Sequence, residues 1–191
     1  IILNGESLTQ DTTFSNTAEI NLYYLVNNYV QVNTGVTLTV EPGVVVKAQG
    51  PGLEVYGTLS APGTESAPIY FTSHRDDRSG GDANLDGFSL GSANDWGGLR
   101  FYNPSVSVLD YTVVKYADWN MRVYGGSTVT ATNSLFANGQ GGVYVSDSSP
   151  TLHHNTIRNN SDHGLRVEGW SAAPSIRNNT LRFNGANLGI Y

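Results

Sequence analysis

A tetrad of residues recurs along this chain with a constant step of 22 residues. Its four copies read GLRF at 98–101, NMRV at 120–123, GVYV at 142–145 and GLRV at 164–167. A second series has nearly the same step and reads YTVV at 111–114, NSLF at 133–136, NTIR at 155–158 and NTLR at 179–182. A period in this range is typical of a solenoid, in which each repeat stacks on its neighbour.

The repeats consist of short strands. Runs such as VTLTV and PIYFTS alternate in polarity and are separated by Gly, Pro and Asn turns, which predicts β-strands. A third, looser series reads SVSV, STVTA, SPTL and APSI. Three strands per coil predict an all-β, right-handed parallel β-helix over residues 28–191, with coils about 4.8 Å apart. A β-sandwich with regular turns is the alternative.

The pattern also assigns residues to the inside of the coil. The first series predicts inward columns of apolar residues: Leu99, Met121, Val143 and Leu165, with Phe101, Val123, Val145 and Val167 beside them. The second series predicts a column of Val113, Leu135, Ile157 and Leu181. Two asparagine ladders are expected from Asn133, Asn155 and Asn179 and from Asn138, Asn160 and Asn184, because stacked amides can bond along the solenoid and satisfy turn backbone.

Several stretches resemble a known group of proteins. TGVTLTVEPGVVVKAQG, LEVYGTLSAPGTESAPIYFTS, DWGGLRF and LDYTVVKYA are similar to the opening coils of right-handed β-helix proteins on bacterial cell surfaces, in the broad pectate-lyase-like superfamily. The resemblance covers roughly residues 28–191 and implies an architecture. It does not select an activity, because lyases, hydrolases, epimerases, adhesins and tail fibres share this fold.

The two ends of the chain differ from the repeats. Residues 1–27 fit no repeat, and TAEINLYYLVNN within or near them is expected to form a cap over the first coil, because an open coil exposes core and strand edges. The sequence stops at NLGIY, within a coil. We therefore expect either that the natural chain continues or that this end stacks on another molecule.

The composition indicates which cellular compartment and which partners suit this chain. Sixteen acidic against ten basic residues give a formal net charge of −6, which argues against nucleic acid as a partner. Cysteine is absent, which excludes disulfides and zinc–thiolate sites. Only 14% of residues are charged, while Gly, Asn, Ser and Thr are frequent, as suits an extracellular β protein. No apolar run approaches the length of a membrane span.

The stretch RDDRSGGDANLDG interrupts the repeat as an insertion at 74–95. Within it Asp82, Asn84 and Asp86 alternate and precede Gly87, like the start of an EF-hand calcium loop. The twelfth position from Asp82 is Ala93, so a complete EF-hand, which needs Glu there, is excluded. A Ca²⁺ site is expected in which Asp82, Asn84 and Asp86 are joined by acids that lie near them in sequence: Asp76, Asp77 and Asp95. The alternative is an exposed turn rich in turn-forming residues.

Outward positions of the first series gather aromatic and charged side chains on one face. The predicted ligand-binding residues are Trp96, Arg100, Tyr102, Asp118, Trp119, Arg122, Tyr124, Tyr144, Asp162, Arg166 and Glu168. Aromatic rings can lie against sugar faces and Arg can bind carboxylates, so a glycan along this face is one hypothesis. The other is a solvated face on which local salt bridges contribute little.

No catalytic site is predicted. Arg122 or Arg166 could serve as the base of a lyase, and Asp118, Asp162 and Glu168 are the only carboxylates for a hydrolase on that face, but neither arrangement is sharply defined. The sequence favours an extracellular, calcium-stabilised β-helix module of a surface or fibre protein, with a structural or adhesive task. Its expected partners are a polysaccharide, a cell-surface glycan or copies of itself. A polysaccharide-active enzyme and a self-assembling filament subunit are the alternatives.

Overall fold

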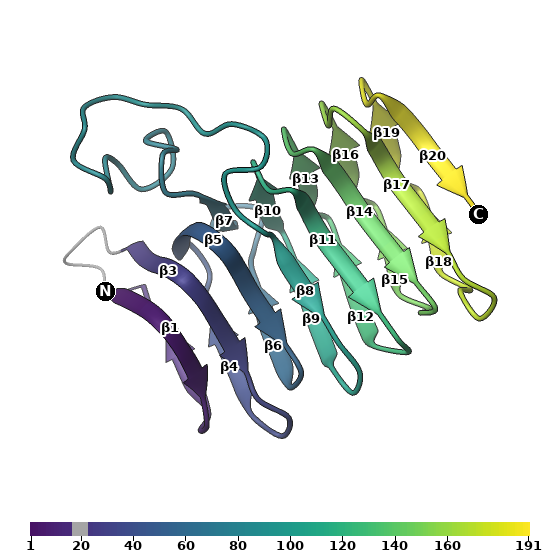
Figure 1. Ribbon diagram of the computed structural model, residues 1–191, viewed down its shortest axis with the longest axis horizontal. Coiled ribbons are helices and arrows are strands. Elements are labelled where there is room, and N and C mark those ends of the chain that lie inside the picture. The colour runs from purple at the N-terminus through teal and green to yellow at the C-terminus, as the bar shows by residue number, and fades with distance from the viewer. Residues whose placement is uncertain (17–22) are drawn as a thin grey trace.

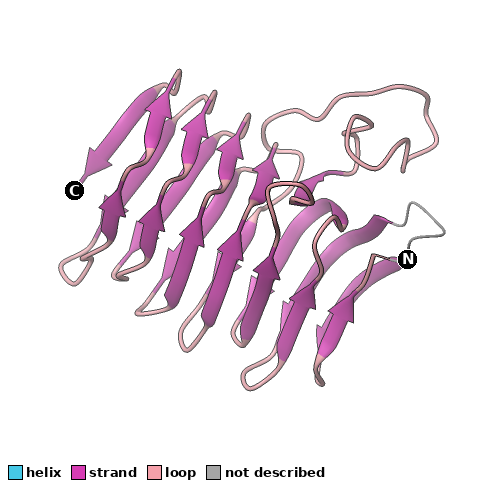
Figure 2. Cartoon of the chain, turned by 180° about the vertical axis from the view of Figure 1, so that it is seen from behind, coloured by secondary structure: helices cyan, strands magenta, loops and turns pink. Residues whose placement is uncertain are grey.

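The computed structural model describes residues 1–16 and 23–191, which form strands, turns and loops (Figures 1 and 2). Every pair of neighbouring strands in this part of the chain is parallel. Successive coils stack side by side from the N-terminal to the C-terminal end (Figure 1). The predicted right-handed parallel β-helix is thus confirmed. Among the described residues no helix is present that could cross a membrane.

Each coil contributes strands to three faces of the solenoid. The first face contains β1 (Ile2–Leu8), β3 (Tyr23–Val32), β5 (Val45–Val55), β8 (Leu99–Phe101), β11 (Trp119–Tyr124), β14 (Gly141–Ser146), β17 (His163–Glu168) and β20 (Ala186–Ile190). The second face contains β2 (Thr12–Phe14), β4 (Thr37–Val40), β6 (Thr58–Pro62), β9 (Val106–Asp110), β12 (Thr128–Thr132), β15 (Thr151–His153) and β18 (Ser175–Arg177). The third face contains β7 (Ile69–Ser73), β10 (Thr112–Lys115), β13 (Leu135–Ala137), β16 (Thr156–Arg158) and β19 (Thr180–Arg182).

The long strand β5 belongs to two faces. Its first half, from Val45 to Ala48, pairs with β7 on the third face, and its second half, from Leu53 to Val55, pairs with β8 on the first. The two faces are therefore one continuous sheet, and the second face is a separate sheet.

The core fills the inside of the coils. On the first face Leu53, Leu99, Met121, Val143 and Leu165 stand opposite one another, each at most 3% exposed. Four of these five formed the predicted inward column, and that prediction is confirmed. The neighbouring predicted column is also buried and consists of Phe101, Val123, Val145 and Val167.

On the third face the predicted inward column is wrong at two positions. Val113 and Leu135 point outward and are half-buried, whereas their neighbours Val114 and Phe136 are fully buried. Phe136 stands opposite Ile157, so the step between these coils is 21 residues and not 22. Ile157 is buried as predicted. Because side chains alternate between the two sides of a strand, a slip of one residue exchanges inside and outside.

Because of the same one-residue slip, the first asparagine ladder differs from the predicted one. The backbone N–H of Ser134 donates to Asn155 Oδ1 at 2.9 Å, and that of Asn155 donates to Asn179 Oδ1 at 2.8 Å. Asn133 lies one residue outside this ladder, is exposed, and has a positive φ of 49°. Asparagine tolerates that left-handed conformation better than most residues, which explains why it aligns in sequence without joining the stack.

The second ladder starts one residue later than predicted. The N–H of Gly139 donates to Asn160 Oδ1 at 3.0 Å, and the N–H of Asn160 donates to Asn184 Oδ1 at 3.1 Å. Asn120 from the preceding coil donates its amide to Asn160 Oδ1 at 3.0 Å. Asn138, predicted as a member, has a positive φ of 57° and lies outside the ladder.

The N-terminal segment is built as a further coil. β1 pairs in parallel with β3, and β2 pairs in parallel with β4. The described part of the predicted cap at 1–27 therefore continues the solenoid, because its strands pair in parallel with the strands of the next coil. Residues 17–22 of that cap lie outside the described part of the chain.

Candidate functional site

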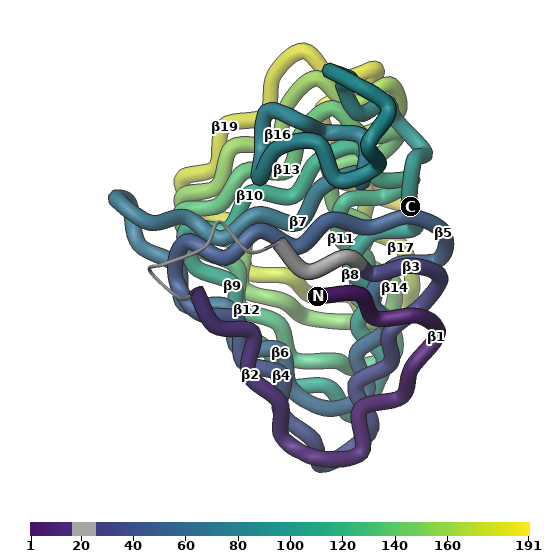
Figure 3. Tube along the Cα trace, turned by 90° about the vertical axis from the view of Figure 1, so that its left-hand side faces the viewer, coloured from purple at the N-terminus to yellow at the C-terminus, as the bar shows by residue number. Residues whose placement is uncertain are grey.

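The loop between β7 and β8 departs from the regular stack on the side of the third face (Figures 1 and 3). β5 pairs with β8 across it, so the coils on either side remain in contact. The acidic stretch thus lies between two paired coils of one solenoid. Its acidic side chains point back onto β5, β7 and β10.

Asp76 anchors this loop to the third face. Its Oδ2 lies 2.7 Å from Lys115 Nζ on β10 and accepts a 2.7 Å hydrogen bond from the Thr72 hydroxyl on β7. The Asp76 side chain is fully buried. Burial alone would raise the pKa of this carboxyl, but the hydrogen bonds from Lys115 and Thr72 outweigh it and lower the pKa. Asp76 is therefore held as a carboxylate by protein groups.

Lys47 on β5 is buried beneath the same loop. Its Nζ lies 3.8 Å from Asp77 Oδ1 and donates to the Gly81 carbonyl. Burial lowers the pKa of this ammonium, and the charges of Asp77 and Asp76 oppose that shift. A lysine with no exposed side-chain surface requires nearby acids or carbonyls, and the loop provides both.

Three acids of the loop converge at one point. Asp77, Asp82 and Asp86 each place one carboxylate oxygen within 4.8 Å of the other two. Asp82 is fixed by the backbone N–H groups of Leu85 and Gly87, at 2.6 and 3.0 Å. A hard cation such as Ca²⁺ prefers carboxylate and amide oxygens of this kind.

Two oxygens near this cluster are buried without a hydrogen bond. They are Asp77 Oδ1 and Asn84 Oδ1. Buried polar atoms in folded proteins nearly always have a partner. Asp77 Oδ1 faces the Lys47 ammonium at 3.8 Å, whereas the Asn84 oxygen has no hydrogen-bond partner in the described chain, and a bound ion would provide one. The chemistry of Asp77, Asp82, Asn84 and Asp86 therefore fits a calcium ion.

The other two predicted ligands lie elsewhere. Asp76 is paired with Lys115. Asp95 accepts hydrogen bonds from the Ser73 hydroxyl at 2.5 Å and from the Ser92 N–H at 2.8 Å, and it lies 3.8 Å from Arg75. Both acids secure the ends of the loop, and neither is in the carboxylate cluster.

A stack of tyrosines runs along the first face. Ring centroids are separated by 4.9 Å for Tyr56 and Tyr102, 5.2 Å for Tyr102 and Tyr124, and 5.8 Å for Tyr124 and Tyr144. The first two pairs are stacked, and Tyr144 meets the ring of Tyr124 edge-on. Sequence reasoning missed Tyr56. The signal was present, because Glu54 aligns with Arg100 and Tyr56 stands two residues after Glu54, as Tyr102 does after Arg100.

The arginines of this face are already paired with acids. Arg122 bonds Asp118, and Arg166 Nε donates to Glu168 Oε1 at 2.5 Å. Arg100 also has a carboxylate 3.7 Å away, on Glu54. An acidic ligand on this face would have to compete with these pairs.

Glu168 has a second partner besides Arg166, and Asp162 pairs with a histidine. The Tyr144 hydroxyl donates to Glu168 at 2.6 Å, which together with Arg166 lowers the pKa of the Glu168 carboxyl. Asp162 Oδ1 lies 2.7 Å from His163 Nδ1. The predicted carboxylates of this face are thus distributed among separate pairs.

The two predicted tryptophans do not offer free rings. Trp96 is 2% exposed, belongs to the hydrophobic core and donates its indole N–H to the Lys115 carbonyl at 2.8 Å. Trp119 is 9% exposed, and its ring covers Gly141 on the next coil. Both fill space between coils, so a ligand on this face would meet the tyrosine edges.

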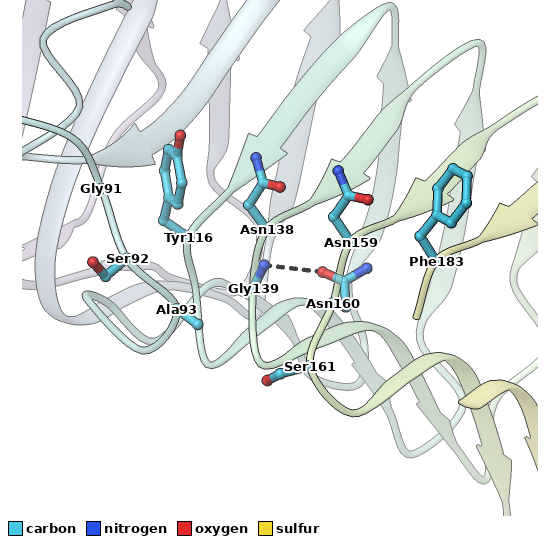
Figure 4. A pocket seen from close by; sticks show the side chains of 10 residues that line it. All are labelled: Gly91, Ser92, Ala93, Tyr116, Asn138, Gly139, Asn159, Asn160, Ser161 and Phe183. Atoms are coloured by element: carbon cyan, nitrogen blue, oxygen red, sulfur yellow. Dashed lines mark hydrogen bonds between the residues drawn. The ribbon is translucent and has the colours of Figure 1, made fainter. Parts of the chain in front are cut away.

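A groove lies at the turn from the third face to the first (Figure 4). It has a volume of about 570 Å³. A row of side chains from successive coils borders it, in the order Tyr116, Asn138, Asn159 and Phe183, and the loop residues 91–93 close one end (Figure 4). Sequence reasoning did not identify this groove, because the turn positions that form it carry no shared motif.

Comparison with known proteins identifies the architecture. A family model described as "Right handed beta helix region" matches residues 2–181. No curated protein and no solved structure matches the chain.

Proposed function

Because this chain belongs to the family of right-handed β-helix proteins, we propose that it is an extracellular, calcium-stabilised module of a surface or fibre protein. Its task would be structural or adhesive. The proposed partners are a polysaccharide or cell-surface glycan, or copies of the chain itself. The observation that carries this proposal is the convergence of Asp77, Asp82 and Asp86 in a loop packed on the third face.

Electrostatics support the calcium ion. Within the described residues neither Asp82 nor Asp86 forms an ion pair with Lys or Arg, although both lie close to Asp77. The Lys47 ammonium pairs with Asp77 and its charge also acts on Asp82, so it offsets one of the three carboxylates. Carboxylates at such short range repel one another unless a cation lies between them. Extracellular modules bind Ca²⁺ with dissociation constants of about 10⁻⁴–10⁻³ M, so calcium outside a cell would fill even a weak site of this kind.

The adhesive part of the proposal is supported by the tyrosine stack. Its four rings form a strip along the solenoid axis, and paired arginines lie beside it. Aromatic side chains with polar tips are suited to surfaces that are partly apolar and partly wet, as a sugar chain requires. A glycan would lie along the strip, across several coils.

The experiment that tests the proposal is a melting curve with and without calcium. Occupancy of a single site at ten to a hundred times its Kd adds about 1.4–2.7 kcal/mol. For a chain of this size we therefore expect EDTA to lower the melting temperature by about 5 °C. The double variant Asp82→Asn, Asp86→Asn should melt at the same temperature with and without calcium.

A matched control removes two charges elsewhere. Glu6 and Glu65 are exposed and lie outside the loop, so Glu6→Gln, Glu65→Gln should keep the full response to EDTA. If EDTA leaves the melting temperature of the unchanged protein where it was, the loop is a turn without an ion and the calcium proposal is wrong.

The enzyme alternative has less support. A glycoside hydrolase needs two carboxylates facing one bond, whereas Asp118, Asp162 and Glu168 each have a separate partner. A lyase needs an unpaired base, whereas Arg122 and Arg166 are paired. We expect no unsaturated product in the ultraviolet absorbance of polyuronate incubated with the protein, and product that disappears in Arg122→Ala would favour the enzyme.

A further inference from the structure

Large apolar side chains are exposed on the loop that carries the carboxylate cluster. Leu85 is 86% exposed, Phe88 73% and Leu90 40%. Leu85 stands between Asn84 and Asp86, and Phe88 follows Asp86 by two residues. The loop itself extends away from the coils (Figure 1). Apolar groups thus protrude from the same segment that supplies the candidate calcium ligands, and exposed apolar groups gathered in one place mark an interaction site.

The acids of the cluster hold the backbone that presents these side chains. The Asp82 carboxylate accepts hydrogen bonds from the backbone N–H groups of Leu85 and Gly87, at 2.6 and 3.0 Å. The Asp77 carboxylate accepts one from the N–H of Ser89 at 2.5 Å. The apolar stretch is therefore fixed at both ends by carboxylates that would also bind the ion, so calcium would determine how this stretch is presented.

Leu85 occupies an unfavourable backbone conformation. Its φ is 58°, in the left-handed region that glycine and asparagine adopt more readily than leucine. The turn itself does not require an apolar side chain at this position. Strained residues in folded proteins cluster at functional sites, and an exposed leucine in such a position is explained by contact with an apolar partner.

The charge around the apolar side chains changes sign when an ion binds. Five carboxylates and four basic groups lie in the loop and directly beneath it, so the net charge of this region is −1 with histidine neutral, and one Ca²⁺ makes it +1. The groups are Asp76, Asp77, Asp82, Asp86 and Asp95, and Lys47, Arg75, Arg78 and Lys115. Arg75 and Arg78 are both exposed, so they are available to an anionic partner.

A membrane of anionic phospholipids matches this arrangement, because negative headgroups cover an apolar interior. The chain as a whole carries a net charge of −6. An anionic surface therefore repels it, except where a positive region comes within a screening length of about 8 Å. A protein partner would need a pocket shaped to the loop, whereas a fluid lipid layer accommodates a protruding loop without one.

We propose that the loop at 74–95 attaches this module to an anionic phospholipid membrane in the presence of calcium, with Leu85 and Phe88 inserted among the lipids. The inference rests on the proposed calcium site and adds a partner to those proposed above. Ca²⁺ takes about six to eight oxygen ligands, more than the four side chains of the cluster provide with one oxygen each. Phosphate oxygens of the headgroups would occupy the remaining positions.

The test is co-sedimentation with vesicles of phosphatidylglycerol and phosphatidylcholine in equal parts, in calcium and in EDTA. We expect binding in calcium, and an affinity at least tenfold lower in EDTA or on phosphatidylcholine alone. The double variant Leu85→Asn, Phe88→Gln should also bind at least tenfold more weakly, because burial of a large apolar side chain contributes roughly a factor of ten or more. Asparagine tolerates the left-handed backbone, so the variant should keep the melting response to EDTA.

A matched control removes two exposed apolar side chains from the second face. Val106 and Val108 on β9 are 57% and 45% exposed, so Val106→Thr, Val108→Thr should bind the vesicles like the unchanged protein. The inference is overturned if the unchanged protein does not bind anionic vesicles in calcium, if its binding persists in EDTA, or if the loop variant binds as tightly as the control.

Two further results separate this inference from other possibilities. If calcium makes the protein dimerise in sedimentation velocity, and Leu85→Asn, Phe88→Gln keeps it monomeric, the loop docks on a second copy and the membrane proposal is wrong. If EDTA lowers the melting temperature but no vesicles are bound, the calcium site stands and the membrane proposal alone is overturned. A melting temperature that does not respond to EDTA would contradict the calcium site itself.

Discussion

Lys115 Nζ lies 2.7 Å from Asp76 Oδ2, and the Asp76 side chain has no exposed surface. This pair joins the acidic loop to β10, one coil beyond the strand from which the loop departs. Thr72 on β7 and Ser79 in the loop bond the same two side chains. The loop is therefore attached to the solenoid by protein contacts, and calcium, if bound, would order the part of it that lies farther out.

Removing the buried acid should strongly destabilise the protein. Asp76→Ala leaves Lys115, which is only 14% exposed, without its carboxylate. Breaking a buried ion pair from one side typically costs 3–5 kcal/mol, and the partial exposure of Lys115 places our expectation at about 3 kcal/mol. Urea unfolding followed by circular dichroism would measure this loss.

The matched control is a pair in the same loop whose arginine is exposed. Arg75 is 46% exposed and lies 3.8 Å from Asp95, so Arg75→Gln should cost less than about 1 kcal/mol. Equal losses in Asp76→Ala and Arg75→Gln would show that the buried pair does not anchor the loop.

The Asp76 carboxylate should make the free energy of unfolding depend on pH in the acid range. The pKa of Asp76 is lower in the folded protein than its ordinary value of 3.8, so the folded state binds this proton more weakly than the unfolded chain does. Its stabilising contribution is complete above pH 3.8 and is lost as the pH falls through the lower folded-state pKa. The difference in unfolding free energy between the unchanged protein and Asp76→Asn should shrink over that range, and a constant difference would contradict the assignment.

The corrected ladder predicts a sharp contrast between two asparagines. Asn155 is 1% exposed, accepts from Ser134 N–H and donates to the Ala131 carbonyl at 2.8 Å. Asn155→Ala leaves both groups buried without a partner, which should cost about 3 kcal/mol. Asn133→Gly, at an exposed turn position, should change the unfolding free energy by less than about 1 kcal/mol. Similar losses at both positions would restore the ladder that the 22-residue spacing predicts.

The sequence predicted the architecture because the repeat and the apolar columns have one physical cause. Coils that pair in register must place apolar side chains at equal intervals, as Leu99, Met121 and Val143 do. The register of the third face could not be predicted, because Leu135 and Phe136 are both apolar and either could point inward. The choice depends on where one residue is lost between coils, and the register places that loss in the turn between β14 and β15, because Tyr124 stands opposite Ser146 whereas Thr130 stands opposite Thr151.

For the acidic loop, the sequence predicted the type of ligand but not which acids come together. Alternating oxygen ligands identified Asp82, Asn84 and Asp86 as a group, but which nearby acids join them depends on how the loop folds back. Lys115 engages Asp76, whereas Asp77 remains beside the cluster. Nothing in the sequence marks Lys115 as the partner of Asp76, because 38 residues separate the two. Aromatic residues were likewise assigned to a face by position, which cannot distinguish the buried Trp96 from the accessible edge of Tyr102.

The proposed adhesive face leads to a prediction about charge competition. Glu168 pairs with Arg166 on the outer side of β17, so an acidic sugar must displace this carboxylate before it can bind the guanidinium. Glu168→Gln removes the competing charge and keeps the size of the side chain. We expect it to raise the affinity for tetragalacturonate about tenfold, which corresponds to about 1.4 kcal/mol, and we expect Arg166→Gln to lower the affinity.

Titration calorimetry at two salt concentrations would measure both effects, because attraction between exposed charges is screened at high ionic strength. Glu65→Gln is the control, since it removes one negative charge from an exposed turn between β6 and β7. If Glu65→Gln and Glu168→Gln raise the affinity equally, the gain reflects net charge alone. An affinity that does not respond to Arg166→Gln would place the acidic sugar away from the tyrosine stack.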